Sequence, residues 1–293
     1  MKIKTIKTIL SAELSSKHKI KTLTRFFKWG LINKFYKKSF NYNYIGNTKL
    51  KVKKGFSSAE LQYYCGLFDF AEMGFLLHFL RKEDTFVDVG ANVGVYSLLA
   101  SGHIGAKTIA YEPVPSTFDY LNENIKLNNI QDHTELNNIG VADKTGTLKF
   151  TSNFDAVNHV INIENSNESY IEVPVSTLDN TLEIYDPTLI KIDVEGYETM
   201  VIKGALNTLK KQSLKAIIIE LNGLSDVFGF DEQKIHEKIL DEGFVPYTYN
   251  PFERKLTEID GIGTDNTIYL RDIEFVKERI LLAPIVNVFG SSF

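Results

Sequence analysis

The stretch TFVDVGANVGVYSLLAS at residues 85–101 decides the fold. An apolar run that contains Asp88 stops at Gly90, and a second apolar run starts at Val95, directly after Gly94. This pattern predicts a buried strand, a tight glycine turn and a helix. Gly90 tolerates backbone angles that other residues resist, and its missing side chain lets a ligand lie against the backbone. In doubly wound sheets, ligands bind at such a place, outside the carboxyl ends of the strands.

A second short strand is predicted at residues 107–112, and it ends in Glu112, 22 residues after Gly90. A carboxylate about 20 residues beyond the glycine turn holds a ribose diol in nucleotide-binding folds. The turn itself reads DVGANVG at residues 88–94, so that Asn92 stands where the dinucleotide fingerprint has its second glycine. That glycine lets the backbone approach a pyrophosphate. Its absence argues against NAD or FAD and favours a nucleoside ligand without phosphates, such as S-adenosylmethionine.

Four strings of the sequence carry a resemblance to a known family: DVGANVGVYS, YEPVPSTFDYLNENIKLN, STLDNTL and LIKIDVEGYETMVIKGA. With them the chain resembles the FkbM-type S-adenosylmethionine-dependent methyltransferases over roughly residues 55–270, and KIDVEGYE at 191–198 is the most specific part. The resemblance implies methylation of hydroxyl groups on sugars and other secondary metabolites. The residues expected to bind the cofactor S-adenosylmethionine are Asp88, Gly90, Ala91, Asn92, Gly94, Glu112, Pro113 and Asp143.

Asp143 is included only by resemblance. Residues 133–141 predict a third strand, and Asp143 follows its end. In many adenosylmethionine folds an acid near this point faces the adenine amino group. The string from Asp143 to Gly146 is equally compatible with a simple turn.

The candidate catalytic residues are Lys191, Asp193 and Glu195, at the end of a fourth strand predicted at residues 189–194. Strand alternation puts the three side chains on one side of the strand, beside the first strand. Two carboxylates this close could raise the pKa of one of them and leave a usable base, with Lys191 orienting both. A salt-bridged entry into the next helix is the structural alternative. No third metal ligand is evident, so no metal site is predicted.

The whole chain predicts an α/β fold with a doubly wound, mostly parallel sheet of seven strands, the Rossmann-like methyltransferase architecture. We divide it into a basic arm with a hairpin (1–54), a methyltransferase domain (55–271) and a tail (272–293). An insertion at 146–175 interrupts the domain and is predicted to be a lid or a substrate platform. The tail is predicted to be a short helix and a loose end.

The arm is strongly basic. Residues 1–54 hold fifteen Lys and Arg and one acid, Glu13, a net charge of +14, which leaves −18 for the rest of a chain whose total is −4. Residues 21–40 interleave these cations with aromatic residues, a pattern typical of a helix that lies in a membrane interface. A helix packed on the domain, or a poorly ordered arm, is equally compatible with it.

The sequence shows no apolar leader segment and no run of about 18 apolar residues. Its single cysteine, Cys65, stands in an apolar setting and indicates a reducing compartment. We therefore expect a cytoplasmic protein, with possible peripheral contact to the inner face of a membrane through the arm.

Three classes of function follow. The favoured one is O-methylation of a sugar, glycan or secondary metabolite. The second is an RNA-binding methyltransferase, since the basic arm would suit RNA. It is less favoured because residues 193–196 lack the Asp/Asn-Pro-Pro-aromatic string of enzymes that methylate base amino groups. The third is a methyltransferase fold that binds a partner without catalysis. This alternative is less favoured because the chain keeps the candidate site residues Asp88, Gly90, Glu112 and Asp193.

Overall fold

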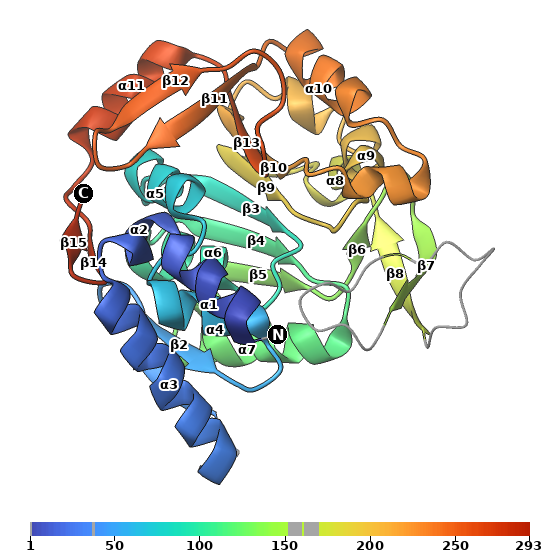
Figure 1. Cartoon of the computed structure of the whole chain (residues 1–293). Helices are drawn as coiled ribbons and strands as arrows, with labels where there is room; N and C mark the ends of the chain where they lie inside the picture. Colours follow the sequence, from blue (N-terminus) through green and yellow to red (C-terminus); the bar gives the residue numbers. More distant parts are fainter. Residues whose placement is uncertain (1, 37–38, 152–159, 161–169) are drawn as a thin grey trace.

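The computed structural model describes residues 2–36, 39–151, 160 and 170–293. Its centre is a sheet of eight strands (Figure 1). In spatial order the strands are β12 (Lys255–Glu258), β11 (Val245–Asn250), β13 (Asn266–Leu270), β10 (Ala216–Glu220), β9 (Leu189–Ile192), β3 (Thr85–Val89), β4 (Lys107–Tyr111) and β5 (Thr134–Asn137).

The five strands from β10 to β5 are parallel to one another, whereas β13 is antiparallel to both β10 and β11. The predicted doubly wound, mostly parallel sheet is confirmed, but it has one strand more than predicted. The extra strand, β12, is the edge strand of the sheet and pairs with β11. Its sequence, KLTE, contains one apolar residue and is largely exposed, so that no apolar pattern marks it.

The strand predicted at 133–141 is in fact two strands. After β5 the chain leaves the central sheet, and β6 (Gly140–Val141) pairs with β8 (Tyr170–Ser176), which also pairs with β7 (Gly146–Thr151). This small sheet contains the described part of the predicted insertion. Residues 152–159 and 161–169 of the predicted insertion lie outside the described residues, whereas Val160 bridges to Phe150.

Helices cover both faces of the central sheet (Figure 1). On one face they are α4 (Ser57–Cys65), α5 (Phe70–Phe79), α6 (Val95–Ser97) with its π-helical continuation η1 (Leu98–Ile104), α7 (Pro115–Leu127) and α11 (Ile273–Leu282). On the other they are α8 (Leu178–Thr181), α9 (Glu198–Lys203) and α10 (Glu232–Asp241). Successive strand residues feed the two cores in turn, because side chains alternate along a strand: Phe86 packs in the first core and Val87 in the second.

The basic arm packs on the domain. It forms α1 (Lys2–Ser11), α2 (Glu13–Ser16), α3 (Lys19–Tyr36) and the predicted hairpin of β1 (Phe40–Asn43) and β2 (Lys49–Val52). Trp29 of α3 is buried in a cluster with Tyr63, Tyr64 and Cys65 of α4. Arg25 also donates a hydrogen bond to the carbonyl oxygen of Tyr63 at 2.7 Å. Of the three alternatives for the arm, the structure therefore shows a packed helix, with one face still open to solvent.

The tail is not the loose end that we predicted. After α11, the short strands β14 (Asn287–Val288) and β15 (Ser291–Ser292) form a hairpin. The ring of Phe293 is buried 5.0 Å from the ring of Phe70, centroid to centroid. Within the described residues, no helix has both the length and the apolar character needed to cross a bilayer.

Candidate active site

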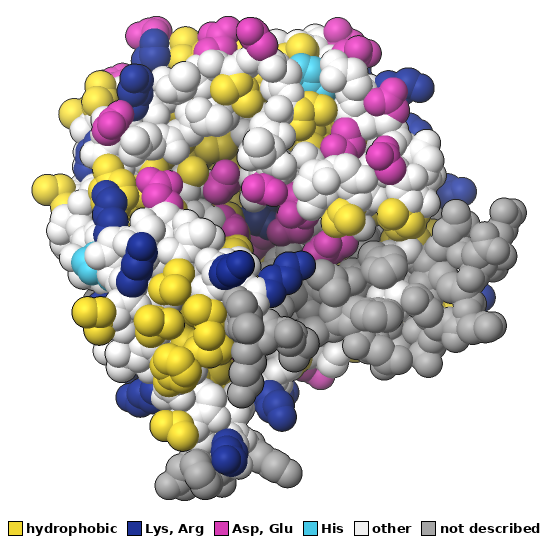
Figure 2. Space-filling view, viewed as in Figure 1, with side chains coloured by type: hydrophobic (Ala, Val, Ile, Leu, Met, Phe, Trp, Pro, Cys, Tyr) yellow, Lys and Arg dark blue, Asp and Glu magenta, His cyan; other side chains and the backbone are white. Residues whose placement is uncertain are grey.

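A cavity of about 320 Å³ lies at the carboxyl ends of β3, β4, β9 and β10. The chain winds outward from β3 through β4 to β5 and then returns to place β9 on the other side of β3. Such a reversal of strand order leaves a crevice beyond the strand ends, which is where ligands bind in this kind of sheet. Figure 2 shows acidic side chains gathered around the hollow on this face.

The glycine turn brings the backbone to the wall of this cavity. The N–H groups of Gly90 and Ala91 both donate to the carbonyl oxygen of Tyr111, at 3.0 and 2.9 Å. Gly90 has a φ of +79°, and a Cβ atom there would lie 1.8 Å from the carbonyl oxygen of Asp193. The turn therefore requires glycine for its backbone angle and for its close approach to the loop after β9.

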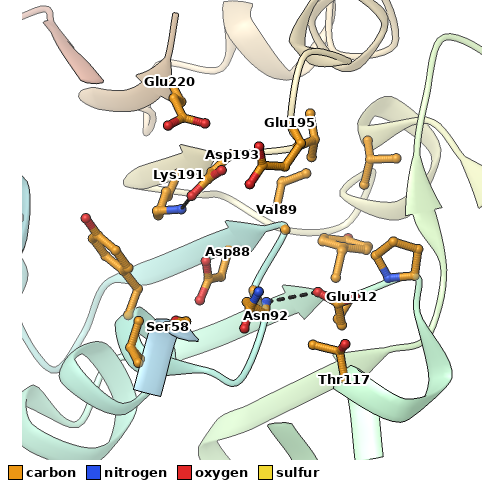
Figure 3. Close-up of a pocket in the computed structure, with 18 of the residues that line it drawn as sticks. Ser58, Asp88, Val89, Asn92, Glu112, Thr117, Lys191, Asp193, Glu195 and Glu220 are labelled. Atoms are coloured by element: carbon orange, nitrogen blue, oxygen red, sulfur yellow. Dashed lines mark hydrogen bonds and ion pairs between the residues drawn. The ribbon is translucent and has the colours of Figure 1, made fainter. Parts of the chain in front are cut away.

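Glu112 is fixed at the end of β4 by two backbone donors. The N–H of Asn92 donates to its Oε2 and the N–H of Val114 to its Oε1, each at 3.0 Å. Asn92 reaches this position with a φ of +50°, in the left-handed region that Asn tolerates better than most residues. Burial raises the pKa of Glu112 to about 7, although both hydrogen bonds oppose the shift. The predicted pair of glycine turn and carboxylate is thus one connected unit (Figure 3).

A buried lysine connects the first strand to the candidate catalytic loop. Lys191 Nζ lies 2.7 Å from Asp193 Oδ2 and 4.7 Å from the centroid of the Tyr96 ring. Asp88 stands opposite Lys191 in the register of β3 and β9, and its Oδ2 accepts from Ser97 Oγ at 2.7 Å. Burial alone lowers the pKa of Lys191, but the Asp193 and Asp88 carboxylates raise it above its ordinary value. The two carboxylates therefore favour the charged form of Lys191 in the cavity.

Three carboxylates meet beside this cation. Asp193, Glu195 and Glu220 each offer an oxygen, and these oxygens lie within 4.8 Å of one another (Figure 3). Burial, and then the Asp193 carboxylate, raise the pKa of Glu195 to about 7. Burial and the charges of Asp193 and Glu195 raise the pKa of Glu220 to about 9. The cluster can therefore hold a proton at neutral pH and exchange it.

Glu220 was not predicted from the sequence to have a role. It supplies the third carboxylate that the sequence of β9 alone could not show, with a spacing that would suit a divalent cation. The signal that could have found it is its position at the carboxyl end of β10, which pairs in parallel with β9.

Two further acids, Asp69 and Glu198, lie in and behind the wall of the cavity. Asp69, which precedes α5, lines the cavity, and its Oδ2 accepts from Tyr96 Oη at 3.2 Å; burial raises its pKa to about 6. Glu198 is buried behind the loop, where its Oε1 accepts from the N–H groups of Val194 at 3.0 Å and Gly196 at 3.3 Å. Glu198 thus holds the loop of the candidate catalytic residues in place, and it is not among the residues that line the cavity. Neither acid was singled out from the sequence.

Most of the predicted cofactor residues line the cavity: Asp88, Gly90, Ala91, Asn92, Glu112 and Pro113. Two do not. Gly94, with a φ of +87°, instead precedes the first turn of α6 and packs against Leu121. Asp143 is exposed in the turn before β7, which favours the alternative of a turn, and its role at the adenine stays a prediction. Residues 139–141 line the cavity instead, because the chain bends away from the central sheet after β5.

Residues 88–246 match the family model described as the methyltransferase FkbM domain. The hexuronic acid methyltransferase AglP of Haloferax volcanii is 30% identical over 152 residues, 50% of this chain and 59% of that protein. The methyltransferase sdnD of Sordaria araneosa is 29% identical over 160 residues, 43% of this chain and 61% of that protein. The chain thus spans about three fifths of the length of these relatives.

Among solved structures, a methyltransferase FkbM from Methylobacillus flagellatus KT aligns with a TM-score of 0.45 and 15% identity, over 75% of this chain and 56% of that one.

Proposed function

Because the chain belongs to the FkbM methyltransferase family, we propose that it transfers a methyl group from S-adenosylmethionine to a hydroxyl group of a sugar or glycan. The observation that supports this most is the single cavity wall formed by the Gly90 turn, Glu112 and the cluster of Asp193, Glu195 and Glu220. The glycine turn and a candidate base thus line the same cavity, as this proposal requires.

The residues of this wall fit the proposed cofactor. The backbone at Gly90 approaches the cavity without a side chain, and the fixed Glu112 carboxylate can accept hydrogen bonds from a ribose diol. The surplus of carboxylates favours a cationic ligand over a phosphate-bearing one. S-adenosylmethionine supplies a sulfonium methyl group, which is a good electrophile. The cavity volume of about 320 Å³ lies at the lower end of the range for small-molecule sites.

We assign the base to Glu195. Its pKa of about 7 lets it take the proton of an acceptor hydroxyl near neutral pH, whereas Asp193 is held in the ion pair with Lys191. Lys191 holds the Asp193 carboxylate beside Glu195. Glu220, whose pKa is also raised, can hold a second proton in the cluster. General-base catalysis contributes roughly 10²–10⁴-fold in rate.

An aromatic wall suits a sugar acceptor. Tyr197 and Phe150 line the cavity, and the ring of Phe228 lies 5.6 Å from that of Tyr197 in an edge-to-face arrangement. Apolar and aromatic lining with a few polar groups is typical of small-molecule sites. The hexuronic acid in the name of the Haloferax volcanii relative makes sugar acids the first acceptors to test.

The test is methyl transfer from labelled S-adenosylmethionine to a panel of neutral sugars, uronic acids, amino sugars and RNA. We expect label on a sugar hydroxyl, and a loss of kcat of roughly 10²–10⁴-fold in Glu195→Gln. The exposed Glu253→Gln is the matched control and should leave kcat unchanged. Label on RNA alone, or cofactor binding without transfer to any acceptor, would instead support one of the two alternative functions.

A further inference from the structure

Helix α3 has an apolar stripe that faces solvent. Its inner face buries Thr22 and Trp29 against the domain. On the opposite side, Ile20, Phe27 and Leu31 are 83%, 59% and 58% exposed. At about 100° per residue these three side chains fall within an arc of about 40°. An exposed stripe of large apolar residues on one helix indicates an interaction surface.

Lysines surround this stripe. Lys19 and Lys28 of α3 are exposed, as are Lys4 and Lys7 of the adjoining α1. Residues 1–54 carry a net charge of +14 with Glu13 as their only acid. Figure 2 shows hydrophobic side chains near α3 on the same face as the acidic hollow. The partner of this surface must therefore combine negative charge with an apolar interior.

We propose that the outer face of α3 docks on an anionic lipid bilayer. An anionic bilayer offers both features: its headgroups attract the lysines, and its acyl chains accept Ile20, Phe27 and Leu31. RNA would satisfy the lysines but gains little from the two aliphatic side chains of the stripe, Ile20 and Leu31, since bases stack on rings and only Phe27 offers one. Trp29 and the Arg25 hydrogen bond to Tyr63 attach the inner face of α3 to the domain, which turns the stripe outward.

Docking would also place the cavity near the bilayer. Helix α4, against which α3 packs, contributes Ser57, Ser58, Leu61 and Gln62 to the cavity lining. Only α3 and α4 then lie between a bilayer bound at the stripe and this side of the cavity, within the part of the chain that the structure describes. An acceptor attached to a lipid would meet the cavity there, an extension that rests on the proposed function, whereas the docking itself does not.

The test is co-sedimentation of the full chain with vesicles of phosphatidylglycerol and phosphatidylcholine, against vesicles of phosphatidylcholine alone. We expect binding to the anionic vesicles that weakens with salt. In Phe27→Ser/Leu31→Ser the partition coefficient should fall on the order of tenfold or more, because two large apolar side chains no longer enter the acyl region. The control Leu282→Ser/Ile285→Ser changes two side chains that are 73% and 70% exposed elsewhere, and should bind as the parent does.

Equal loss of binding in both double variants, or no binding of the parent to anionic vesicles, would overturn the proposal. Salt-sensitive binding of RNA without vesicle binding would overturn it in favour of a nucleic-acid partner. Transfer to a soluble acceptor should be unchanged in Phe27→Ser/Leu31→Ser, which separates the docking from the catalytic function.

Discussion

At the scale of single residues, Gly90 has the least room in the site. A Cβ atom there would overlap the carbonyl oxygen of Asp193 at 1.8 Å, and the φ of +79° disfavours any side chain. We expect Gly90→Ala to lower the free energy of unfolding by on the order of 1–3 kcal/mol and to weaken binding of S-adenosylmethionine, as measured by denaturant unfolding and calorimetry. Gly146→Ala, with nothing within 4 Å of its Cβ and no positive φ, is the control. Unchanged binding in Gly90→Ala would show that the turn does not hold the ligand.

Loss of the Glu220 proton should lower the stability of the fold as the pH rises. Its folded pKa of about 9 lies above its ordinary value of 4.5, so between these values the folded chain holds a proton that the unfolded chain has lost. Its contribution to stability is full below pH 4.5 and is lost as the pH rises toward 9. In Glu220→Gln the melting temperature should fall less between pH 6 and pH 9 than in the parent. The exposed Glu253→Gln is the control, and a parallel decline in all three proteins would contradict the raised pKa.

The sequence predicted the site residues that depend on a single strand. Lys191 and Asp193 share a side because strand alternation requires it, and their ion pair follows. Glu220 was not predicted as a site residue, because its position in the site depends on the pairing of β10 with β9, which the sequence of one strand does not reveal. Asp143 does not line the cavity because the chain leaves the central sheet after β5, and nothing in the sequence marks that departure.

At the scale of elements, α3 is the segment whose role the sequence left open. Its cations and aromatic residues are equally compatible with a membrane helix and with a packed one, because hydrophobic spacing does not say what covers each face. The structure shows that the two faces differ: Trp29 faces the domain and Phe27 faces solvent. The prediction of a loose C-terminal end was wrong for a related reason. The contact that fixes it, between Phe293 and Phe70, joins two distant parts of the chain and leaves no local pattern in the sequence.

This division of α3 can be tested by two substitutions in one helix. We expect Trp29→Ala to lower the free energy of unfolding by about 3–5 kcal/mol, the usual cost of removing a large buried aromatic side chain. Phe27→Ala, two residues away and more than half exposed, should cost much less. Chemical denaturation of the full chain measures both. Equal effects would mean that the arm does not pack through Trp29.

At the scale of the whole molecule, charge is divided between two regions. The arm carries +14 and the rest of the chain −18, and part of that negative charge surrounds the cavity. The doubly wound sheet could be predicted because the glycine turn and its following acid are local patterns. The eighth strand, the small sheet of β6 to β8 and the packing of the arm could not, because they depend on contacts between distant segments.

The measurement that tests the central claim most directly is calorimetric binding of S-adenosylmethionine and of NAD to the full chain, with the parent, Glu112→Ala and the control Glu123→Ala, an exposed carboxylate of α7. We predict binding of S-adenosylmethionine and none of NAD, with affinity lost in Glu112→Ala and kept in Glu123→Ala. Thermal melts confirm that each variant is folded. A folded parent that binds NAD, or that does not bind S-adenosylmethionine, would contradict the assignment of the cavity.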